Sequence, residues 1–316
     1  MRSIKILAPA KVNLFLKILN RRSDSYHNIL TLFERITLTD EITISKTPEG
    51  IEVSSNRFIT ADPKDNLAYK AAEAILKYKR VDRGVRIRVK KGIPIAAGLG
   101  GGSSDAAGVL LGMNRLFKFG LKQNELLRLG SRLGADVPFF VSNMRFAIGK
   151  GRGEVLIRSG LKMNLWHLIV YPGFTLSTKD VYNAFDRNIA IKTKDLTLRQ
   201  CSGSSPEQLP KGLTKKSGDV KIQPGIKASM DFDKLEEMLY NDLQDIAVAK
   251  KKVIGRIIER LASSLGKKIV VSGSGPSVFC LYRTRREAIK AKDRLLACVS
   301  ALERKRWQIF VAGTKI

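Results

Sequence analysis

A glycine-rich stretch over 94–110, PIAAGLGGGSSDAAGVL, constrains the fold more than any other part of the sequence. The run VRIRVKK over 85–91 precedes it and alternates apolar with charged residues, which indicates a half-buried strand. The small-residue segment that follows is typical of a helix. The turn from strand to helix contains four glycines, Gly98, Gly100, Gly101 and Gly102.

Such a turn can hold a large anion. Glycine reaches backbone angles closed to other residues and has no side chain, so a ligand can come close to the main-chain N–H groups. The unpaired N–H groups of the first helical turn and the positive end of the helix dipole attract negative charge. Ser103 and Ser104 are expected at the N-cap of the helix, where a hydroxyl reaches a phosphate oxygen or a metal-bound water. The sequence therefore predicts a polyphosphate loop.

Other interpretations of this stretch fit less well. A flexible Gly/Ser linker is not expected between a buried strand and an Ala-rich helix. The spacing GxxxxGK[ST] of a Walker A loop is missing, since no Lys follows the last glycine. The dinucleotide fingerprint GxGxxG fits only if Ser103 takes the place of its third glycine.

Length and composition indicate an ordinary globular protein of two domains, since the chain has 316 residues, 44% of them hydrophobic. No apolar run approaches about 18 residues and no signal peptide is visible, so we expect a cytoplasmic protein without a membrane segment. The net charge of +28 raises the alternative of a nucleic-acid partner. The excess is spread along the chain, because residues 1–160 contain 28 basic and 14 acidic residues and the remainder 29 and 15. No aromatic-interleaved basic patch stands out, which argues against a nucleic-acid role.

The cysteines and histidines argue against a structural metal. The three cysteines are far apart and form no CxxC pattern, so neither a disulfide framework nor a zinc site is indicated. His27 and His167 are the only histidines, too few for a His-ligated metal. His167 lies inside the apolar run LWHLIVYP over 165–172, where we expect a structural residue.

Apolar residues at helical spacing predict further helices over 67–79, capped by Asp65 and Asn66, from 243 towards 265, and from 285 to about 302.

Single side chains elsewhere have both a structural and a functional interpretation. Lys11 precedes the half-buried strand pattern VNLFLKIL, where a solvated strand end is the common role and a positioned cation beside Asn13 is the alternative. Tyr26 and His27 are adjacent in a polar turn, where packing at a loop exit is the simple interpretation. Asp136 precedes a proline in GADVPFF, and an Asp there is commonly an N-cap.

Several of these segments resemble known motifs. The pattern Pro-x-x-x-Gly-Leu-Gly-x-Gly-Ser-Ser resembles the second motif of the GHMP kinase superfamily, which includes galactokinase, homoserine kinase and mevalonate kinase. The pair PAKVNLFLKI and RRSDSYHNI resembles, more narrowly, the branch that phosphorylates 4-diphosphocytidyl-2-C-methyl-D-erythritol, with its pattern PAKxNLxLxV and RxDGYHxL. GADVPFF, PGFTLSTKDVYNAF and the turn GKGRGEVL resemble further segments of that branch. The turn over 273–276 resembles the third GHMP motif, which implies that it packs against the phosphate loop. One departure is visible: Ser25 stands where the branch usually has Gly.

The resemblance implies an α+β, two-domain GHMP kinase fold. Residues 1–160 would form a ribosomal-protein-like N-terminal domain and residues 161–316 an α/β sandwich-like C-terminal domain, with the active site in the cleft between them. The polar segment 191–227 would be a loop inserted into the second domain. We expect a monomer or weak homodimer whose partners are ATP and a small-molecule alcohol.

The resemblance also implies a reaction, the transfer of the γ-phosphate of ATP to the 2-hydroxyl of the diphosphocytidyl sugar alcohol, in the non-mevalonate route to isoprenoid precursors. Mg²⁺ would assist, with ligands left unknown. Asp136 would accept or orient the hydroxyl proton, and Lys11 would stabilise negative charge on Asp136 and on the transferred group. The residues expected to bind ATP are Asn66, Lys91, Pro94, Ala96, Ala97, Gly98, Leu99, Gly100, Gly101, Gly102, Ser103 and Ser104. Those expected to bind the alcohol are Asn13, Tyr26, His27, Thr178, Tyr182, Gly273 and Ser274, with Tyr26 and Tyr182 on the two faces of the cytosine ring.

Two other functions stay open at this level. One is a GHMP kinase for a different alcohol, such as homoserine or mevalonate. The other is a basic RNA-binding protein built on a similar small α/β domain, in which Asp136 and the glycine loop would have no role.

Overall fold

The computed structural model describes residues 3–188 and 230–315, so the predicted insertion over 191–227 lies outside the described residues. Residues 178–188 are helical. The other elements are β1 (Ser3–Arg21), β2 (His27–Thr47), β3 (Ile51–Ser55), η1 (Pro63–Asp65), α1 (Leu67–Lys79), β4 (Gly84–Lys90), α2 (Gly101–Leu116), α3 (Gln123–Leu133), α4 (Val137–Ser142), β5 (Phe146–Lys150), β6 (Val155–Arg158), β7 (Trp166–Tyr171), α6 (Phe232–Met238), β8 (Tyr240–Asn241), α7 (Gln244–Lys250), α8 (Lys252–Leu265), β9 (Val270–Val271), β10 (Val278–Tyr282), α9 (Arg285–Cys298), α10 (Ala301–Arg306) and β11 (Gln308–Gly313).

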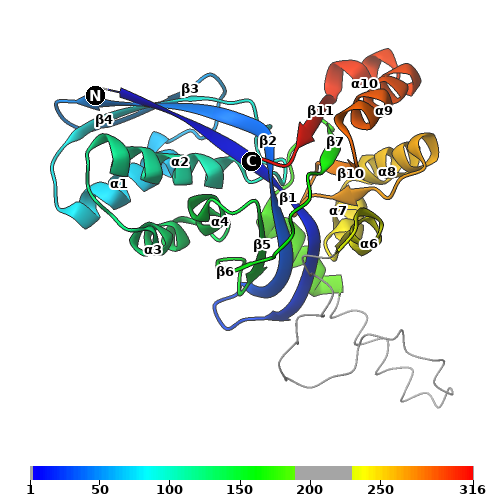
Figure 1. Cartoon of the computed structure of the whole chain (residues 1–316), viewed down its shortest axis with the longest axis horizontal. Coiled ribbons are helices and arrows are strands. Elements are labelled where there is room, and N and C mark those ends of the chain that lie inside the picture. Colours follow the sequence, from blue (N-terminus) through cyan, green and yellow to red (C-terminus); the bar gives the residue numbers. More distant parts are fainter. Residues whose placement is uncertain (1–2, 189–229, 316) are drawn as a thin grey trace.

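The first sheet is built around a long antiparallel ribbon of β1 and β2. Its strand order is β3-β4-β2-β1-β8, with β5 paired to β2 and β6 paired to β5. Helices α1 to α4 gather along one side of this ribbon in Figure 1. Small residues let α2 lie close to the sheet, because a Cβ on Gly108 would come within 2.7 Å of the Ile42 side chain. The glycine loop between β4 and α2 is thereby held between a sheet and a helix layer.

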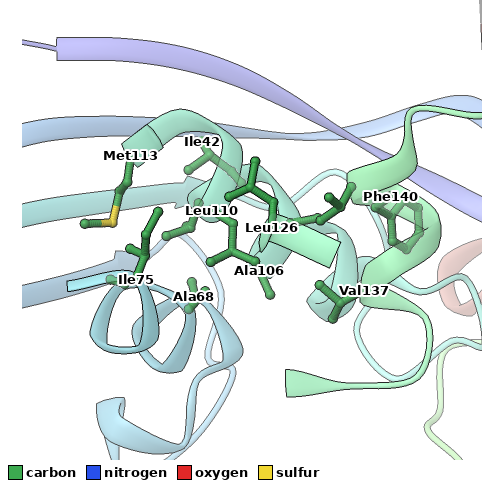
Figure 2. Close-up of a cluster of buried hydrophobic side chains, with 14 of the residues drawn as sticks. Ile42, Ala68, Ile75, Ala106, Leu110, Met113, Leu126, Val137 and Phe140 are labelled. Atoms are coloured by element: carbon green, nitrogen blue, oxygen red, sulfur yellow. The ribbon is translucent and has the colours of Figure 1, made fainter. Parts of the chain in front are cut away.

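The core of the N-terminal half lies between that sheet and helices α1 to α4. Figure 2 shows Ile42 from the sheet meeting Ala106, Leu110 and Met113 from α2. All four of these side chains are fully buried. Burying a side chain of this size contributes about 1.5–3 kcal/mol, so the core fixes the position of α2 and of the loop at its N-terminus.

The second sheet has the order β11-β7-β10-β9 and is antiparallel. Helices α8, α9 and α10 lie beside it, at the opposite end of the molecule from α1. The two halves share structure, because β8 pairs with β1 in the first sheet and Leu16 and Ile18 of β1 are buried in the second core. Strand β6, which ends at Arg158, belongs to the first sheet, and β7, which begins at Trp166, to the second, but the β1–β2 ribbon serves both cores.

The position of Lys11 differs from the sequence prediction. Lys11 does not begin a strand, since it lies in the middle of the continuous β1, and its side chain is buried. The pairing register between β1 and β2 shifts between Pro9 and Lys11 and again between Asn13 and Phe15. Such bulges re-aim the side chains of a strand. The alternating pattern could not show this, because a bulge leaves the local composition unchanged.

Two helices predicted as single elements are divided. The segment predicted as one helix over 243–265 is broken at Lys251, which has the non-helical angles φ −141° and ψ 88°. The segment predicted over 285–302 ends at Cys298, and Ser300 caps a new short helix by accepting a hydrogen bond from the N–H of Glu303. Apolar spacing alone does not detect such breaks when both parts face the same core.

The turn between β1 and β2 carries the one departure from the family pattern. Ser25 has φ +67°, in the left-handed region that glycine enters freely. The turn keeps its hydrogen bonds, with the N–H of Arg22 donating to the carbonyl of Tyr26 at 2.8 Å. Ser25 therefore preserves the geometry that a glycine would give, at a conformational cost.

We expect the substitution Ser25→Gly to raise the free energy of unfolding by about 0.5–1 kcal/mol, because it removes the cost of a left-handed serine. Urea denaturation would measure the change. Ser23→Gly is the matched control, since Ser23 lies in the same turn without a positive φ. An equal gain from both substitutions would contradict the explanation.

Candidate active site

The glycine loop is held in backbone contact with the turn after β9. Gly98 and Gly100 have φ of +78° and +72°. A Cβ on Gly98 would approach the carbonyl oxygen of Ser272 to 2.1 Å, so no other residue fits there. Within the predicted loop, Pro94, Ala97 and Leu99 are buried and Ala96 is exposed.

The serines lie differently from the prediction. Gly100 is the N-cap of α2, and Ser103 and Ser104 lie within the first helical turn. Among the described residues, the buried hydroxyl of Ser104 finds no hydrogen-bond partner. The first N–H groups of a helix have no partner inside it, and those of α2 begin at Gly101. The loop thus keeps the properties of an anion site, with main-chain groups in the place predicted for the serines.

Lys91 is buried next to Gly101 of the glycine loop. Its buried ammonium donates hydrogen bonds to Asp40 and, at 2.7 Å, to Asp105. Burial raises the pKa of Asp105 to about 7, with the carboxylate of Asp40 adding to the rise and Lys91 opposing it. A Cβ on Gly101 would lie 3.3 Å from this ammonium. The sequence prediction placed Lys91 on ATP directly, whereas the structure shows both of its carboxylate partners inside the protein.

A glycine turn from the C-terminal half closes over the loop. The hydroxyl of Ser272 donates to the carbonyl of Gly98 at 2.9 Å. Asn241 of β8 holds the turn by donating from Nδ2 to the carbonyls of Val271 and Gly273, both at 2.7 Å. The prediction that this turn packs against the phosphate loop is confirmed. Sequence analysis missed Asn241, because nothing in the local pattern marks a buried asparagine as a brace.

Lys11 and Asp136 meet at the mouth of the glycine loop. The Lys11 ammonium donates to the carbonyl of Gly98 at 3.0 Å and lies 3.7 Å from the Oδ2 of Asp136. Burial lowers the pKa of Lys11, and the nearby Asp136 carboxylate partly opposes that fall. The two predicted catalytic side chains are therefore in one place, although they are far apart in the sequence.

The structure argues against a capping role for Asp136. The residue is at the N-cap position of α4, but its side chain accepts no hydrogen bond from that helix. The carboxylate is partly open to solvent, with 29% of the side chain exposed. A Cβ on Gly153, in the predicted turn GKGRGEVL, would lie 3.8 Å from its Oδ1. Asp136 is thus free to meet a ligand beside a glycine that leaves room for one.

His27 anchors a second wall of the site. Its ring lies 5.1 Å from that of Tyr182, centroid to centroid, with an interplanar angle of 31°. Its Nε2 lies 2.7 Å from the Oδ1 of Asp186. Burial raises the pKa of Tyr182, and the charge of Asp136 adds to the rise. Thr178, at the start of the same helix, shares a 2.8 Å hydrogen bond with Ser274 of the glycine turn.

Two predicted substrate residues lie in unexpected surroundings. Asn13 is 2% exposed; its Oδ1 accepts from Lys11 at 2.5 Å, and its Nδ2 donates to Thr31 at 2.8 Å. It braces the ammonium of Lys11. Tyr26 is 55% exposed, and the guanidinium of Arg152 lies 5.0 Å from the centre of its ring. In this structure Tyr26 has no aromatic contact with Tyr182.

Two cavities adjoin the other side of the glycine loop. One, of about 280 Å³, is lined by residues 53–60 together with Pro63 and Asn66. Asn66 caps α1, as predicted, and a Cβ on Gly102 would lie 3.6 Å from the adjacent Leu67. The larger cavity, of about 700 Å³, extends from Phe58 to Ile95 of the loop and to Arg306 of the C-terminal half.

The structural prediction for His167 is confirmed. The ring is fully buried, with Nε2 at 2.9 Å from Glu34 and Nδ1 at 3.1 Å from the carbonyl of Ala312. Both ring nitrogens are therefore satisfied inside the protein. Across residues 3–188 and 230–315, no cluster of three His, Cys, Asp or Glu side chains could hold a metal ion.

Comparison with known proteins identifies the family. The GHMP kinase N-terminal domain matches residues 66–143, and the GHMP kinase C-terminal domain matches residues 223–301. The 4-diphosphocytidyl-2-C-methyl-D-erythritol kinase of Geobacter metallireducens is 38% identical over 91% of this chain and 92% of its own length. That of Pelobacter propionicus is 37% identical over 94% and 95%. The chain belongs to the 4-diphosphocytidyl-2-C-methyl-D-erythritol kinases. They are a branch of the GHMP kinases.

Solved structures agree with this membership. A crystal structure of 4-(cytidine 5'-diphospho)-2C-methyl-D-erythritol kinase superposes with a TM-score of 0.71, at 28% identity and 98% coverage of both chains. Homoserine kinase from Cytophaga hutchinsonii superposes with a TM-score of 0.70 at 16% identity, covering 100% of this chain and 95% of its own, which shows a shared fold alone. The predicted two-domain GHMP kinase fold is confirmed. No helix in the described ranges is long and apolar enough to cross a membrane.

Proposed function

We propose that this protein transfers the γ-phosphate of ATP to the 2-hydroxyl of 4-diphosphocytidyl-2-C-methyl-D-erythritol, in the non-mevalonate route to isoprenoid precursors. The observation that supports it most is the position of the Lys11 ammonium, between the glycine loop at Gly98 and the carboxylate of Asp136. A cation there faces the transferred phosphate on one side and the acceptor alcohol on the other. The choice of substrate rests on the family, and the proposed chemistry rests on the side chains of Lys11 and Asp136.

The glycine loop binds the triphosphate in this proposal. Phosphate oxygens accept hydrogen bonds from the N–H groups that open α2, and the dipole of this 16-residue helix adds attraction. The adenosine lies towards Asn66, in the cavities on either side of Phe58.

Mg²⁺ fits the site as a companion of the nucleotide. When the ion is bound, phosphate and water oxygens would supply most of its ligands, as Mg²⁺ prefers. The hydroxyl of Ser104 and Oδ1 of Asp105, near the start of α2, have no hydrogen-bond partner among the described residues and would be the protein oxygens available to this shell. When bound, the ion neutralises charge on the phosphates.

In the transfer itself, a bond forms between the 2-hydroxyl oxygen and the γ-phosphorus. The bond between that phosphorus and the β,γ-bridging oxygen breaks, and its electron pair leaves with ADP. The hydroxyl proton passes to the carboxylate of Asp136, which returns it to solvent after the product departs. Lys11 stabilises the negative charge on the phosphoryl group in the transition state. Asn13 holds Lys11 in line through its 2.5 Å hydrogen bond.

The cytidine end of the alcohol is bound by the wall around His27. His27 and Ile29 point to the same side of β2, because alternate residues of a strand share a face. A Cβ on Gly153 would lie 3.6 Å from Ile29 and 3.8 Å from Asp136. The wall therefore begins beside the acceptor hydroxyl, with Tyr182 stacked against His27 for the base and Thr178 beside Ser274 for the polyol.

Product analysis tests the proposal. We expect the protein, mixed with ATP, Mg²⁺ and the diphosphocytidyl alcohol, to form equal amounts of ADP and a monophosphorylated product. Phosphorus NMR should place the new phosphate on the 2-position. Homoserine and mevalonate serve as competing acceptors. Phosphorylation of either small alcohol in preference to the cytidyl substrate would overturn the assignment.

A further inference from the structure

We propose that Asp186 is a positioning residue that selects cytosine over uracil by fixing the tautomer of His27. The inference rests on the proposed function, since it concerns the base of the same acceptor. It starts from the 2.7 Å contact between the Oδ1 of Asp186 and the Nε2 of His27. The His27 side chain is only 5% exposed there, so the contact is shielded from water.

The contact has one possible direction. An ionised carboxylate can only accept hydrogen bonds, so the hydrogen must be on Nε2 of His27. A neutral imidazole carries one N–H, and its other nitrogen is then an acceptor. No hydrogen bond to Nδ1 of His27 is found in the part of the chain that the structure describes. In its neutral form the ring therefore offers an acceptor that no described residue uses.

Cytosine and uracil differ at the position that such an acceptor reads. Position 4 of cytosine carries an amino group, which donates, and position 4 of uracil carries a carbonyl, which accepts. An acceptor at Nδ1 bonds the first and repels the second. A buried polar group left without its partner costs enough to discriminate strongly between ligands.

Two neighbours hold this arrangement in place. Asp186 lies on the helix over 178–188, which also carries Tyr182, whose ring is tilted by 31° against the His27 ring at 5.1 Å. Phe185 of the same helix meets that ring edge-on, at 6.4 Å and 89°. The other oxygen of Asp186 faces the Nε of Arg21 at 3.5 Å. Arg21 is a donor only, so it competes for any oxygen at this position.

That competition makes the substitution Asp186→Asn informative. The asparagine has one carbonyl oxygen, which accepts the hydrogen bond from Arg21. Its NH₂ group then points towards Nε2 of His27 and donates to it. The proton of the ring moves to Nδ1, which becomes a donor suited to the carbonyl of uracil. Asp186→Ala leaves the ring free to take either tautomer.

Calorimetric titration with CDP and with UDP, with the ATP site filled by a non-hydrolysable ATP analogue, measures base preference without turnover. We expect wild type to bind CDP more tightly, and Asp186→Asn to shift the CDP-to-UDP affinity ratio at least about tenfold towards UDP. Asp186→Ala should lower the ratio towards one. The matched control is Asp180→Asn, the same change at an exposed position of the same helix, which should keep the wild-type ratio.

The outcomes separate this inference from the proposed function. An unchanged ratio in both Asp186 variants, or a wild type that does not distinguish CDP from UDP, overturns the role of Asp186. Equal weakening of both ligands would show a purely structural residue and overturns it as well. The proposed function fails separately, if wild type forms no phosphorylated product from the cytidyl alcohol.

Discussion

We expect Asp136→Asn to lower kcat by about 10²–10⁴-fold, the range that a positioned general base contributes. The amide keeps the size of the side chain but cannot take the hydroxyl proton. The KM for ATP should change little, since the proposed triphosphate site is the glycine loop, which contacts Lys11 through the carbonyl of Gly98. Steady-state ADP release, with the cytidyl alcohol as acceptor, measures both constants.

Stability provides the control for this prediction. The side chain of Asp136 caps no N–H of α4, so Asp136→Asn should lower the free energy of unfolding only through the ion pair that the buried Lys11 loses. Asp231 is a true cap of α6, where it accepts a 2.9 Å hydrogen bond from Lys234. Asp231→Ala should cost about 1 kcal/mol of stability and spare activity. A variant Asp136→Asn that unfolds easily and turns over normally would contradict the catalytic assignment.

Lys11→Met should lower kcat by about 10²–10³-fold, the effect of losing one preorganised group that stabilises transition-state charge. Methionine fills the space of the lysine chain. The loss should act on the same step as Asp136→Asn, so the double variant should be little slower than the slower single variant. Lys5→Met is the control: Lys5 lies on the same strand, but 71% of its side chain is exposed.

The free energy of unfolding of the Lys11→Met variant should depend less on pH than that of wild type. The pKa of Lys11 is lowered from its ordinary 10.5 by burial. The unfolded chain therefore holds this proton more tightly than the folded one, and wild type should gain stability as pH rises through the window between the lowered pKa and 10.5. The variant lacks that gain. Denaturation curves at neutral and alkaline pH would show it, and identical pH dependence in both proteins would contradict the buried ammonium.

Much of the fold could be predicted from local sequence. Helix α1 was placed with its bounds and its Asn66 cap, because capping and apolar spacing act within a few residues. The strand before the glycine loop and the helix after it were also placed correctly. The bulge at Lys11 and the helix break at Lys251 were not predicted, because each depends on packing against residues far away in the sequence.

In the candidate site, too, some residues could be predicted from local sequence and others could not. The glycine loop could be found from its residues, because glycine enters the positive φ angles of Gly98 and Gly100 at far lower cost than other residues do. The ion-pair partners of Lys91 could not be predicted, since a lysine pairs with whichever carboxylates the fold brings near, here Asp40 and Asp105. Asn241 and Asp186 gave no local signal either, because each acts through one hydrogen bond to a distant part of the chain.

The sequence by itself determined the glycine loop between strand and helix, the family and the residue types proposed for catalysis, because these depend on backbone preferences and motifs that are local. Only the tertiary structure decided that Lys11 meets Asp136 under the turn at Gly273 and that His27 meets Asp186. The physical reason is that such pairs come from segments far apart in the chain. Their meeting depends on the packing of the two cores around one shared ribbon.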